Sequence, residues 1–407
     1  RFFIALLIYF SWGPLAGGVV TAPVPEFSSP ALIPYPSKVV RGAGEAGFRS
    51  VQVKVGPDVP GRDDLMKEIK DIFRTSGIQG SLNSGGAAEG AMTWELFPDA
   101  RMKGEGYDLS VGLGKATVRA GSFGGFFNAL QTLRQLVFNR EGEFAMPVVR
   151  ISDKPAFVLR GIMLDVGRYY MSPALIKEVM RRLSRYKINT LHLHLTDDPA
   201  WRLEVKKYPA LTDGAFHWKS RLPGRFYTQA QLKDLTDYCA RLNIQVIPEI
   251  DMPGHSQPFA RAMKTGMQTE KGVSILKDVV DEAVSLFPGR FFHMGSDEAH
   301  ISMKDFIPRM AEHIRGEGKE VVVWSPGGPH DKDSVLMCWG ENEAGARMDK
   351  NMKRIDSNGF YIDWADSQSG VYQVFFQQPC EVPQGDDKAL GAIMPVWCDG
   401  NLSSERR

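Results

Sequence analysis

Two adjacent carboxylates follow an apolar segment near residue 297. The segment Phe291–Met294 is typical of the end of a buried strand, Gly295 and Ser296 open a turn, and Asp297 and Glu298 come next. Two neighbouring acids in a partly dry pocket rarely ionise together, so one of them tends to keep its proton. An acid beside an anion is suited to cleaving a glycosidic bond. Most Asp-Glu pairs, however, are solvated or lie in the first turn of a helix, so the rest of the chain must decide.

The segments that would position this pair have the pattern of an α/β barrel. From Arg160 onward, apolar strand-like segments alternate with amphipathic helical ones, which is typical of a parallel sheet wrapped in helices. Eight such segments equal the strand count of a (β/α)8 TIM barrel, in which catalytic groups follow the carboxyl ends of the strands. The predicted strands are Gly161–Asp165, Thr190–Leu195, Ile244–Ile250, Phe291–Met294, Glu320–Trp324, Val335–Trp339, Arg354–Ser357 and Ala392–Trp397.

Helix signals and the end of the chain refine this expectation. Ser172 before Pro173 predicts a capped helix start, and Thr228 with Gln231 predicts a capping box. Only ten residues follow Trp397, so we expect the eighth barrel helix to be missing and the record to be truncated. The outer faces of the eighth and first strands would then lack a cover, which favours aggregation.

The preceding part of the chain predicts a small non-catalytic α+β domain. No constellation of acids and histidines occurs between residues 23 and 150, and we place the barrel domain at 151–407. Alternation and helical periodicity predict strands and helices in turn. They are the strand Arg49–Val55, the helix Asp63–Phe73, a loop at Ser84–Gly86, the strand Tyr107–Leu113 and the helix Phe123–Phe138.

The N-terminus has the pattern of an export signal. Arg1 precedes the apolar run Phe2–Phe10, and small residues follow up to Ala22. A basic residue, a short apolar core and a small-residue site predict a signal peptide over residues 1–22. The run is too short to span a bilayer, so we expect a secreted or periplasmic protein with no membrane insertion in its mature form. A buried N-terminal strand is the alternative.

Composition excludes several classes of partner. Hydrophobic residues make up 43% and charged residues 24%, as in globular proteins with a full core. The 49 basic residues balance 48 acidic ones, which argues against nucleic acid or an anionic membrane as partner. Four cysteines are too few for a disulfide scaffold and lack metal-type spacing, so buried structural thiols are expected. They are Cys239, Cys338, Cys380 and Cys398.

Polar and indole side chains recur at the ends of the predicted strands. Each has an ordinary structural explanation when taken singly, as a turn aspartate, a core tryptophan or a hydrogen-bonded histidine. Jointly they occupy the end of a barrel where enzymes work, and acids mixed with indoles suit a sugar. The set comprises Asp165, Arg168, His194, Asp197, Asp198, Glu249, Asp251, His255, Asp297, Glu298, Trp324, Trp339, Tyr361, Asp363, Trp397 and Asp399.

The motifs in this order resemble a known family. The sequence is similar to glycoside hydrolase family 20, the β-N-acetylhexosaminidases, from roughly residue 33 to 399. The resemblance implies a TIM barrel preceded by a small α+β domain, no cofactor, and a terminal N-acetylhexosamine of oligosaccharides or glycoconjugates as substrate. The strings that carry it are Arg160-Gly161, His192-x-His194-x-Thr196-Asp197-Asp198, Trp201-Arg202, Pro248-Glu249-Ile250-Asp251-Met252-Pro253-Gly254-His255 and His293-x-Gly295-x-Asp297-Glu298.

The resemblance also implies an exo-acting retaining hydrolase without an enzyme nucleophile, in which the substrate's own 2-acetamido oxygen attacks the anomeric carbon to give an oxazolinium ion. Glu298 would be the general acid and base, its proton held more firmly beside anionic Asp297, and Asp297 would orient the acetamide. Tyr361 would donate a hydrogen bond to the acetamide oxygen. The expected sugar-binding residues are Arg160, Asp198, His255, Trp324, Trp339, Asp363, Trp397 and Asp399.

The sequence departs from the family pattern at two positions besides its end. Ser296 stands where a glycine is usual, and we expect this change to be tolerated. Asp399 stands where a sugar-binding glutamate is expected after the last tryptophan. Because aspartate is one methylene shorter, its contact is expected to need a water molecule or a shifted sugar.

Two other functions remain as alternatives. His192 and His194 near Asp197 and Asp198 have the residue types of a metal-dependent hydrolase, but residues two apart share one face of a strand and no third histidine is expected at a matching strand end. Activity that survives a chelator would exclude this alternative. A catalytically inactive sugar-binding protein is the other, and turnover of an aryl N-acetyl-β-glucosaminide would exclude it. The preference for gluco or galacto sugars and the oligomeric state are not readable from the sequence.

Overall fold

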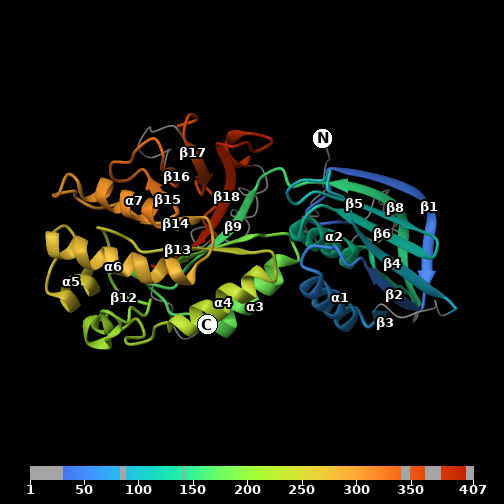
Figure 1. Cartoon of the computed structure of the whole chain (residues 1–407), viewed down its shortest axis with the longest axis horizontal. Coiled ribbons are helices and arrows are strands. Elements are labelled where there is room, and N and C mark those ends of the chain that lie inside the picture. Colours follow the sequence, from blue (N-terminus) through green and yellow to red (C-terminus); the bar gives the residue numbers. More distant parts are fainter. Residues whose placement is uncertain (1–30, 83–88, 141–142, 341–348, 363–376, 400–407) are drawn as a thin grey trace, which may run out of the picture.

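The computed structural model describes residues 31–82, 89–140, 143–340, 349–362 and 377–399. The predicted export signal, the Ser84–Gly86 loop and Asp363 lie outside the described residues. Figure 1 shows two units side by side, a β-rich domain that precedes a barrel with helices around it.

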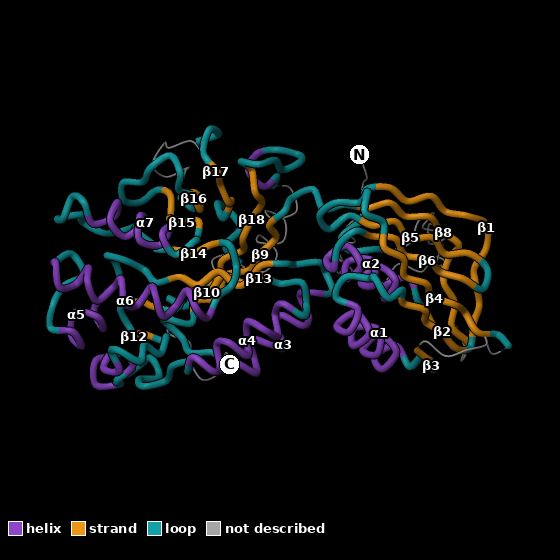
Figure 2. The backbone as a smooth tube through the Cα atoms, in the orientation of Figure 1, coloured by secondary structure: helices purple, strands orange, loops and turns teal. Residues whose placement is uncertain are grey.

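The barrel is closed and all its strands are parallel. Its order is β10-β13-β14-β15-β16-β17-β18-β9, so the first and last strands pair with each other (Figure 2). All eight predicted strands are confirmed, with ends that differ by up to three residues. They are β9 (Leu159–Asp165), β10 (Thr190–His194), β13 (Gln245–Glu249), β14 (Phe291–His293), β15 (Glu320–Ser325), β16 (Val335–Cys338), β17 (Lys353–Asp356) and β18 (Ala389–Val396).

Helices cover the strands of the first half of the barrel. The predicted caps are present, since the Ser172 hydroxyl accepts from the Leu175 amide and Thr228 and Gln231 form the capping box. In the described parts of the connections after β15, β16 and β17 the only helix is the short 3-10 turn η3 (Pro379–Glu381). Within the described residues, the expected alternation of strands and α-helices is therefore confirmed for the first four barrel strands. The helices are α3 (Pro173–Ser184), α4 (Gln229–Ala240), α5 (Gln257–Met263), α6 (Glu270–Leu286) and α7 (Phe306–Gly316).

The connection between β10 and α4 is the longest irregular segment described near the barrel mouth. It contains the small ribbon of β11 (Thr196–Asp197) and β12 (Ala200–Trp201), followed by the 3-10 turns η1 (Pro209–Thr212) and η2 (Gly214–Phe216). No helix among the described residues has the length and apolar character needed to cross a bilayer.

The N-terminal domain is a mixed sheet with two helices on one face. The sheet order is β1-β8-β5-β6-β4-β2-β3, with β7 paired to β8. The helices α1 (Arg62–Ser76) and α2 (Phe123–Leu136) lie on the face turned toward the barrel (Figure 1). The strands are β1 (Lys38–Phe48), β2 (Ser50–Val55), β3 (Gln79–Leu82), β4 (Ala91–Pro98), β5 (Tyr107–Gly112), β6 (Lys115–Ala120), β7 (Phe138–Arg140) and β8 (Glu143–Asp153).

Close packing holds α2 on this sheet. A Cβ added at Gly125 would lie 2.5 Å from the Gly106 carbonyl oxygen, so only glycine allows this approach. Trp94 and Tyr107 are fully buried beneath the helices. Strand β8 runs to Asp153, so the domain boundary lies a few residues later than the expected position at 150.

Ion pairs join the two domains at the amino-terminal end of the barrel strands. Lys187 donates to Asp153 at 2.9 Å, and Arg160 donates to Glu105 at 2.5 Å. Glu68 of α1 accepts from Arg181 of α3 at 2.6 Å. Because these charges are largely buried, removal of one partner would leave the other uncompensated, so the N-terminal domain fixes the orientation of the barrel.

The side chains of all four cysteines are buried. They are Cys239, Cys338, Cys380 and Cys398. Burial raises the pKa of Cys239 to about 12 and that of Cys380 to about 11. A thiol that stays protonated is a poor nucleophile. The prediction of buried thiols is therefore confirmed.

Candidate active site

The loop after β14 places the two adjacent carboxylates at the carboxyl end of the barrel. Ser296 has a φ of 82° and Glu298 a φ of 46°, both in the left-handed region that side chains rarely adopt. At Gly295, a Cβ would lie 1.9 Å from an Asp251 carboxylate oxygen, so glycine is required there. Strained backbone of this kind is concentrated at functional sites.

Ser296 is tolerated in this loop at a local cost. Its left-handed φ is one that glycine adopts more readily, which explains why a glycine would be the simpler residue. Its hydroxyl is buried and makes no hydrogen bond within the described residues. The side chain therefore contributes strain rather than a contact.

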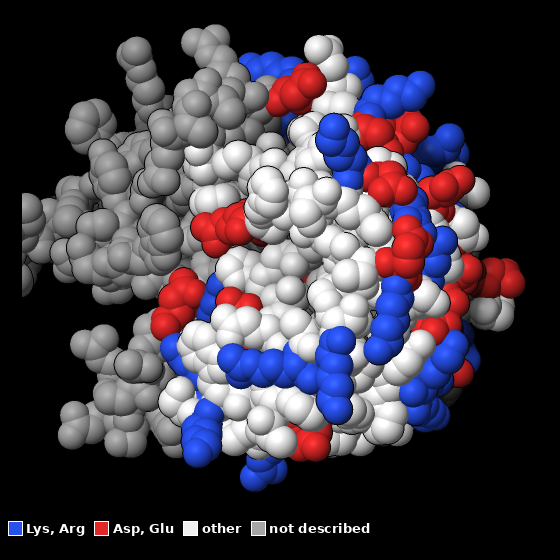
Figure 3. Space-filling model, turned by 90° about the vertical axis from the view of Figure 1, so that its left-hand side faces the viewer, with Lys and Arg blue, Asp and Glu red and all other residues white. Residues whose placement is uncertain are grey.

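A cavity of about 250 Å³ opens at this end of the barrel. In Figure 3, uncharged side chains fill the centre of the face drawn, and acidic and basic side chains both lie around them. The cavity is large enough for one sugar ring, and its lining combines carboxylates with indoles. The lining residues are Arg168, His194, Asp251, His255, Asp297, Glu298, Trp324, Trp339, Tyr361, Trp397 and Asp399.

The two carboxylates differ in their surroundings. Asp297 is largely buried, whereas the Glu298 side chain is 59% exposed. Burial, together with the carboxylates of Glu249 and Glu298, raises the pKa of Asp297 to about 7. The carboxyl group with the raised pKa is therefore Asp297. The sequence interpretation had instead expected Asp297 to be an anion that keeps the proton on Glu298.

Asp251 lies behind Asp297 and is completely buried. Its burial and the nearby carboxylates of Asp297 and Glu249 raise its pKa well above the usual range. A carboxyl group in this position keeps its proton when its neighbour ionises. The two carboxyl groups therefore resist ionising together.

Glu298 is connected to a second set of polar groups through His255. The His255 Nε2 atom lies 3.3 Å from a Glu298 carboxylate oxygen, and Nδ1 lies 3.8 Å from Asp197 and 4.0 Å from Asp198. Asp198 accepts from the backbone amide of Gln257 at 3.2 Å and does not line the cavity. The predicted binding residue Asp198 therefore stands behind His255 and acts on its position.

The prediction for Arg160 is wrong. Arg160 is the second residue of β9, at the opposite end of the barrel from the cavity, and donates to Glu105 of the N-terminal domain and to the carbonyls of Phe157 and Lys187. Parallel strands present their first residues to the opposite end from the catalytic loops. The guanidinium group in the cavity belongs to Arg168, three residues after the end of the same strand.

Arg168 is held by three carboxylates. It donates to Asp165 at 3.0 Å, to Asp197 at 2.9 Å and to Asp399 at 2.9 Å. Its guanidinium carbon lies 5.0 Å from the centre of the Trp397 ring. Although burial alone would lower its pKa, these carboxylates raise the pKa of Arg168 above its usual range, so the group stays charged. The shorter Asp399 side chain thus reaches Arg168, and its carboxylate remains 57% exposed at the cavity mouth.

Three indoles and a phenol form the aromatic wall. The rings of Trp324 and Trp397 have centroids 5.7 Å apart, and those of Tyr361 and Trp397 are stacked at 6.4 Å. Trp324 donates to Glu249 at 2.8 Å, and Trp339 donates to the Pro326 carbonyl at 3.0 Å. The planes of Trp324 and Trp339 are therefore fixed by their own hydrogen bonds, and Trp397 packs against Trp324 and Tyr361.

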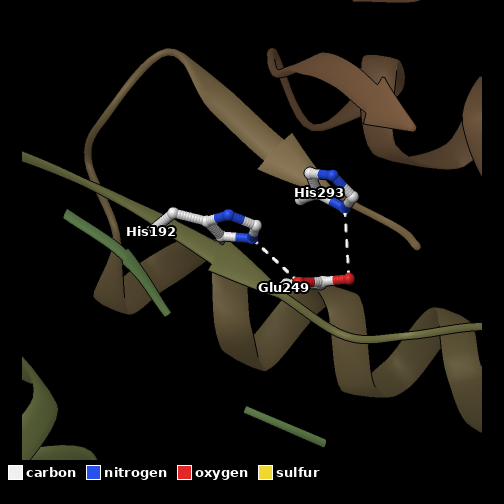
Figure 4. A group of neighbouring side chains, drawn as sticks. All are labelled: His192, Glu249 and His293. Carbon is white, nitrogen blue, oxygen red and sulfur yellow. Dashed lines mark ion pairs between the residues drawn. The ribbon is translucent and has the colours of Figure 1, made fainter. Parts of the chain in front are cut away.

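His192, Glu249 and His293 form a buried cluster (Figure 4), which contacts the cavity-lining residues His194 and Trp324 through Glu249. His192 and His293 stack with centroids 4.7 Å apart, and Glu249 lies 2.8 Å from His192 Nε2 and 3.4 Å from His293 Nδ1. His293 is thus the third histidine that the sequence interpretation did not expect at a matching strand end. Burial lowers its pKa to about 3, so its ring is neutral.

Glu249 is the centre of this cluster. It accepts from His194 at 2.7 Å, and it also accepts from Trp324. Burial disfavours both charges, but the carboxylates of Glu249 and Asp197 raise the pKa of His194 well above its usual value and the histidines keep the pKa of Glu249 low. The result is an internal ion pair beneath the sugar-sized cavity.

Close groups of histidines and carboxylates have the donor types of a metal site. Those with ligand atoms within 4.8 Å of one another are His192-Glu249-His293, His194-Glu249-Asp251 and Asp251-His255-Asp297. In the first two groups Glu249 already accepts from a histidine and an indole, and His293 Nδ1 accepts from the Gly295 amide at 3.0 Å. A metal ion would have to displace these hydrogen bonds, which favours a hydrogen-bonded core.

Three cavity residues had no assigned role in the sequence interpretation. Arg168, His194 and Asp251 had been noted at strand ends without a role. Their positions in the chain would have identified them. Arg168 follows β9, His194 ends β10 and Asp251 follows β13. Asp363 lies outside the described residues.

Two family models match the chain. The catalytic domain of glycosyl hydrolase family 20 matches residues 157–273, and domain 2 of the same family matches residues 29–154. Together the two regions cover more than half of the chain. Asp297 and Glu298 lie beyond the matched part of the catalytic domain.

Curated relatives and solved structures agree with the family models. A β-hexosaminidase of Porphyromonas gingivalis is 30% identical over 75% of this chain and 49% of its own length. One from Akkermansia muciniphila is 30% identical over 65% of each chain. The chain therefore spans about half to two thirds of the length of these relatives.

The structural neighbours cover most of the chain. The chitobiase of Flavobacterium johnsoniae is 26% identical with a TM-score of 0.76, over 90% of this chain and 65% of its own. The N-acetyl-β-hexosaminidase of Streptomyces plicatus, solved with Thio-NAglucal, is 25% identical with a TM-score of 0.77, over 90% and 85%. With its barrel, its preceding domain and both family models, this chain belongs to glycoside hydrolase family 20.

Proposed function

We propose that this chain is an exo-acting retaining β-N-acetylhexosaminidase that releases a terminal N-acetylhexosamine from glycans. The observation that carries the proposal is the one-sugar cavity in which partly buried Asp297 and exposed Glu298 lie side by side next to an indole wall. A related Streptomyces plicatus enzyme was solved with the product N-acetylglucosamine. A blind pocket of this size accepts the end of a glycan rather than its middle.

Asp297 is assigned to the acetamide group of the substrate. As an anion it accepts the acetamide N–H, turns the acetamide oxygen toward the anomeric carbon and offsets the positive charge that develops on the oxazolinium ion. Tyr361, across the cavity, donates to the acetamide oxygen, while Trp324, Trp339 and Trp397 enclose the methyl group and the sugar face. The acetamide oxygen forms the new bond to the anomeric carbon as the glycosidic bond breaks.

Glu298 is assigned to proton transfer. It gives its proton to the departing glycosidic oxygen, then takes a proton from the water that opens the oxazolinium ion and restores the acetamide. Its exposure and its 3.3 Å approach to His255 support this role, because the leaving group and the water must pass the open side of the cavity. His255 and Asp198 position this carboxyl group.

The outer hydroxyls of the sugar are assigned to Arg168 and Asp399 in place of Arg160. The Arg168 guanidinium is a rigid donor fork, and the exposed Asp399 carboxylate beside it is an acceptor. A neutral polyol can bridge two such groups, and Asp399 carries the charge at the mouth of the cavity.

The two arginines provide a direct test of this assignment. Arg168→Gln should lower kcat/KM for an aryl N-acetyl-β-glucosaminide by about 100-fold, since hydrogen bonds from charged groups contribute roughly 1.5–3 kcal/mol each. Arg160→Gln should leave KM unchanged and lower the melting temperature, because it leaves Glu105 without its cation. Loss of substrate affinity in Arg160→Gln with unchanged stability would contradict the assignment.

The activity itself is tested with a small substrate panel. Aryl N-acetyl-β-glucosaminide should be hydrolysed, whereas the aryl β-glucoside without the acetamide should not. A thiazoline mimic of the oxazolinium ion should inhibit much more tightly than the sugar product, as transition-state analogues do. Trapping of a covalent sugar–protein adduct would instead establish an enzyme nucleophile.

We further propose that the apolar run Phe2–Phe10 directs export, so that the enzyme acts on glycans outside the cytoplasm. Amino-terminal sequencing of the protein from the exported fraction tests this, with cleavage expected near Ala22. Recovery of the uncleaved chain from the cytoplasm would contradict it.

A further inference from the structure

An exposed tryptophan stands on a firmly anchored loop beside the cavity. Trp218 is 39% exposed and belongs to the segment 217–225 that follows η2. Fully buried Arg202 holds this segment by donating to the carbonyls of Arg221 at 2.6 Å, Leu222 at 2.9 Å and Arg225 at 2.7 Å. The indole is therefore presented to solvent by a fixed backbone.

The segment 217–225 connects two parts of the cavity rim. Arg221 donates to the carbonyls of Cys398 at 2.9 Å and Asp399 at 2.7 Å. At the other side, the Trp218 amide donates to the Pro199 carbonyl at 2.9 Å, and its indole Nε1 approaches Gln257 at 3.4 Å. The segment thus extends from the side of Asp399 to the start of α5.

Trp218 lies on the side of the cavity where the leaving group departs. Gln257 is two residues after His255, whose ring contacts Glu298 at 3.3 Å. Because Glu298 protonates the glycosidic oxygen, the rest of the glycan must leave the cavity past this carboxyl group. Among the described residues, Trp218 is an exposed aromatic side chain joined to this side of the cavity through Gln257.

The surroundings of Trp218 differ from those of a structural indole. Trp201 is 1% exposed and donates to the Leu203 carbonyl at 2.8 Å, as buried tryptophans normally do. Within the described part of the chain, the only hydrogen bond of the Trp218 indole is the long one to Gln257, and its ring is left partly in water. An exposed indole of this kind is suited to stacking on the C–H face of a sugar ring.

We propose that Trp218 forms the binding site for the penultimate sugar of the glycan, the ring that carries the scissile oxygen. This inference rests on the proposed function, since it assumes that the terminal sugar occupies the cavity and that Glu298 faces the leaving group. Trp218 is a specificity determinant rather than a catalytic residue. It favours glycan leaving groups that present a flat pyranose face over leaving groups without a ring.

Two substrates with different leaving groups test the site. One is the β-1,4-linked N-acetylglucosamine trisaccharide, whose second ring would stack on Trp218, and the other is N-acetyl-β-glucosaminyl fluoride, whose leaving group is one atom. Trp218→Ala should raise KM for the trisaccharide roughly 3–10-fold with kcat little changed, as expected for loss of one stacking contact. The fluoride should keep its kcat/KM, and Trp218→Phe should restore most of the trisaccharide affinity.

Tyr186→Ala is the matched control, because Tyr186 is 51% exposed and follows α3 at the opposite end of the barrel. It should change neither substrate. Equal losses for both substrates in Trp218→Ala, or no loss for either, would overturn the inference. If the wild-type protein hydrolyses neither substrate, the proposed function fails. Calorimetric titration of wild type and Trp218→Ala with the trisaccharide then tests whether Trp218 binds the sugar. Equal affinities, or no binding by either protein, would overturn the inference.

Discussion

Replacement of Glu298 with glutamine should lower kcat for the trisaccharide by about 10²–10⁴-fold, the usual contribution of general acid–base catalysis. A sugar alkoxide cannot depart without a proton, and an amide cannot supply one. A dinitrophenyl leaving group departs without protonation, so its first step should be largely spared. The two substrates should therefore separate by at least tenfold in their response to the same substitution.

Steady-state kinetics with both substrates, and with azide as an added nucleophile, measures this separation. Azide needs no general base, so it should accelerate the second step of Glu298→Gln with the dinitrophenyl substrate. Glu312→Gln, an exposed substitution on α7, is the matched control and should behave as wild type. Equal losses for both substrates would show that Glu298 is not the acid.

The order of strands was predictable because each strand is a local apolar segment. The eight barrel strands were all recognised from runs such as Val335–Cys338, whose every residue is buried. The connection after β15 was less predictable, because residues 326–334 form no helix and do not carry the helical periodicity found in α3 or α6. Hydrophobic periodicity arises from the face that a segment buries, so a connection that buries no face has no periodic pattern to detect.

Whether a side chain can reach the cavity depends on which end of its strand it occupies. Arg160 is the second residue of β9 and Arg168 lies three residues beyond its end, so they belong to opposite ends of the barrel. A motif that contains an arginine does not by itself distinguish these ends. The rule that cavity residues follow a strand would have selected Arg168.

Some parts of the site arise only from the closed barrel. His192 and His293 lie on strands β10 and β14, which are separated by β13 and its Glu249. Their stacking across one strand could not be read from positions about a hundred residues apart. The raised pKa of Asp297 likewise follows from burial beside Glu249, a neighbour that the Asp-Glu string does not contain.

Replacement of Asp297 with asparagine should lower activity and raise stability at the same time. An amide cannot offset the charge on the oxazolinium ion, so kcat/KM should fall by roughly 10²–10³-fold, the usual effect of removing one preorganised electrostatic contact. The wild-type kcat/KM should rise as the pH passes about 7, where Asp297 ionises in the free enzyme. The residual activity of Asp297→Asn should lack this limb of the profile.

The stability change has a defined dependence on pH. In the wild type the pKa of Asp297 rises from 3.8 to about 7 on folding, so below about pH 4 both states are protonated and the carboxyl group imposes no electrostatic cost. Between those values the unfolded chain ionises while the folded one keeps its proton, so stability falls as the pH rises and then levels off above about pH 7. The asparagine side chain does not ionise, so the stability of Asp297→Asn lacks this dependence on pH.

Asp297→Asn should therefore melt at the same temperature as the wild type near pH 4 and several degrees higher at pH 8. Differential scanning calorimetry across this range measures the difference, and Asp387→Asn, at an exposed position, should show none. A variant that is less stable than the wild type at pH 8 would mean that Asp297 is stabilised as an anion in the empty cavity. In that case the acid limb of the kcat/KM profile should also lie well below pH 7, so the two measurements check each other.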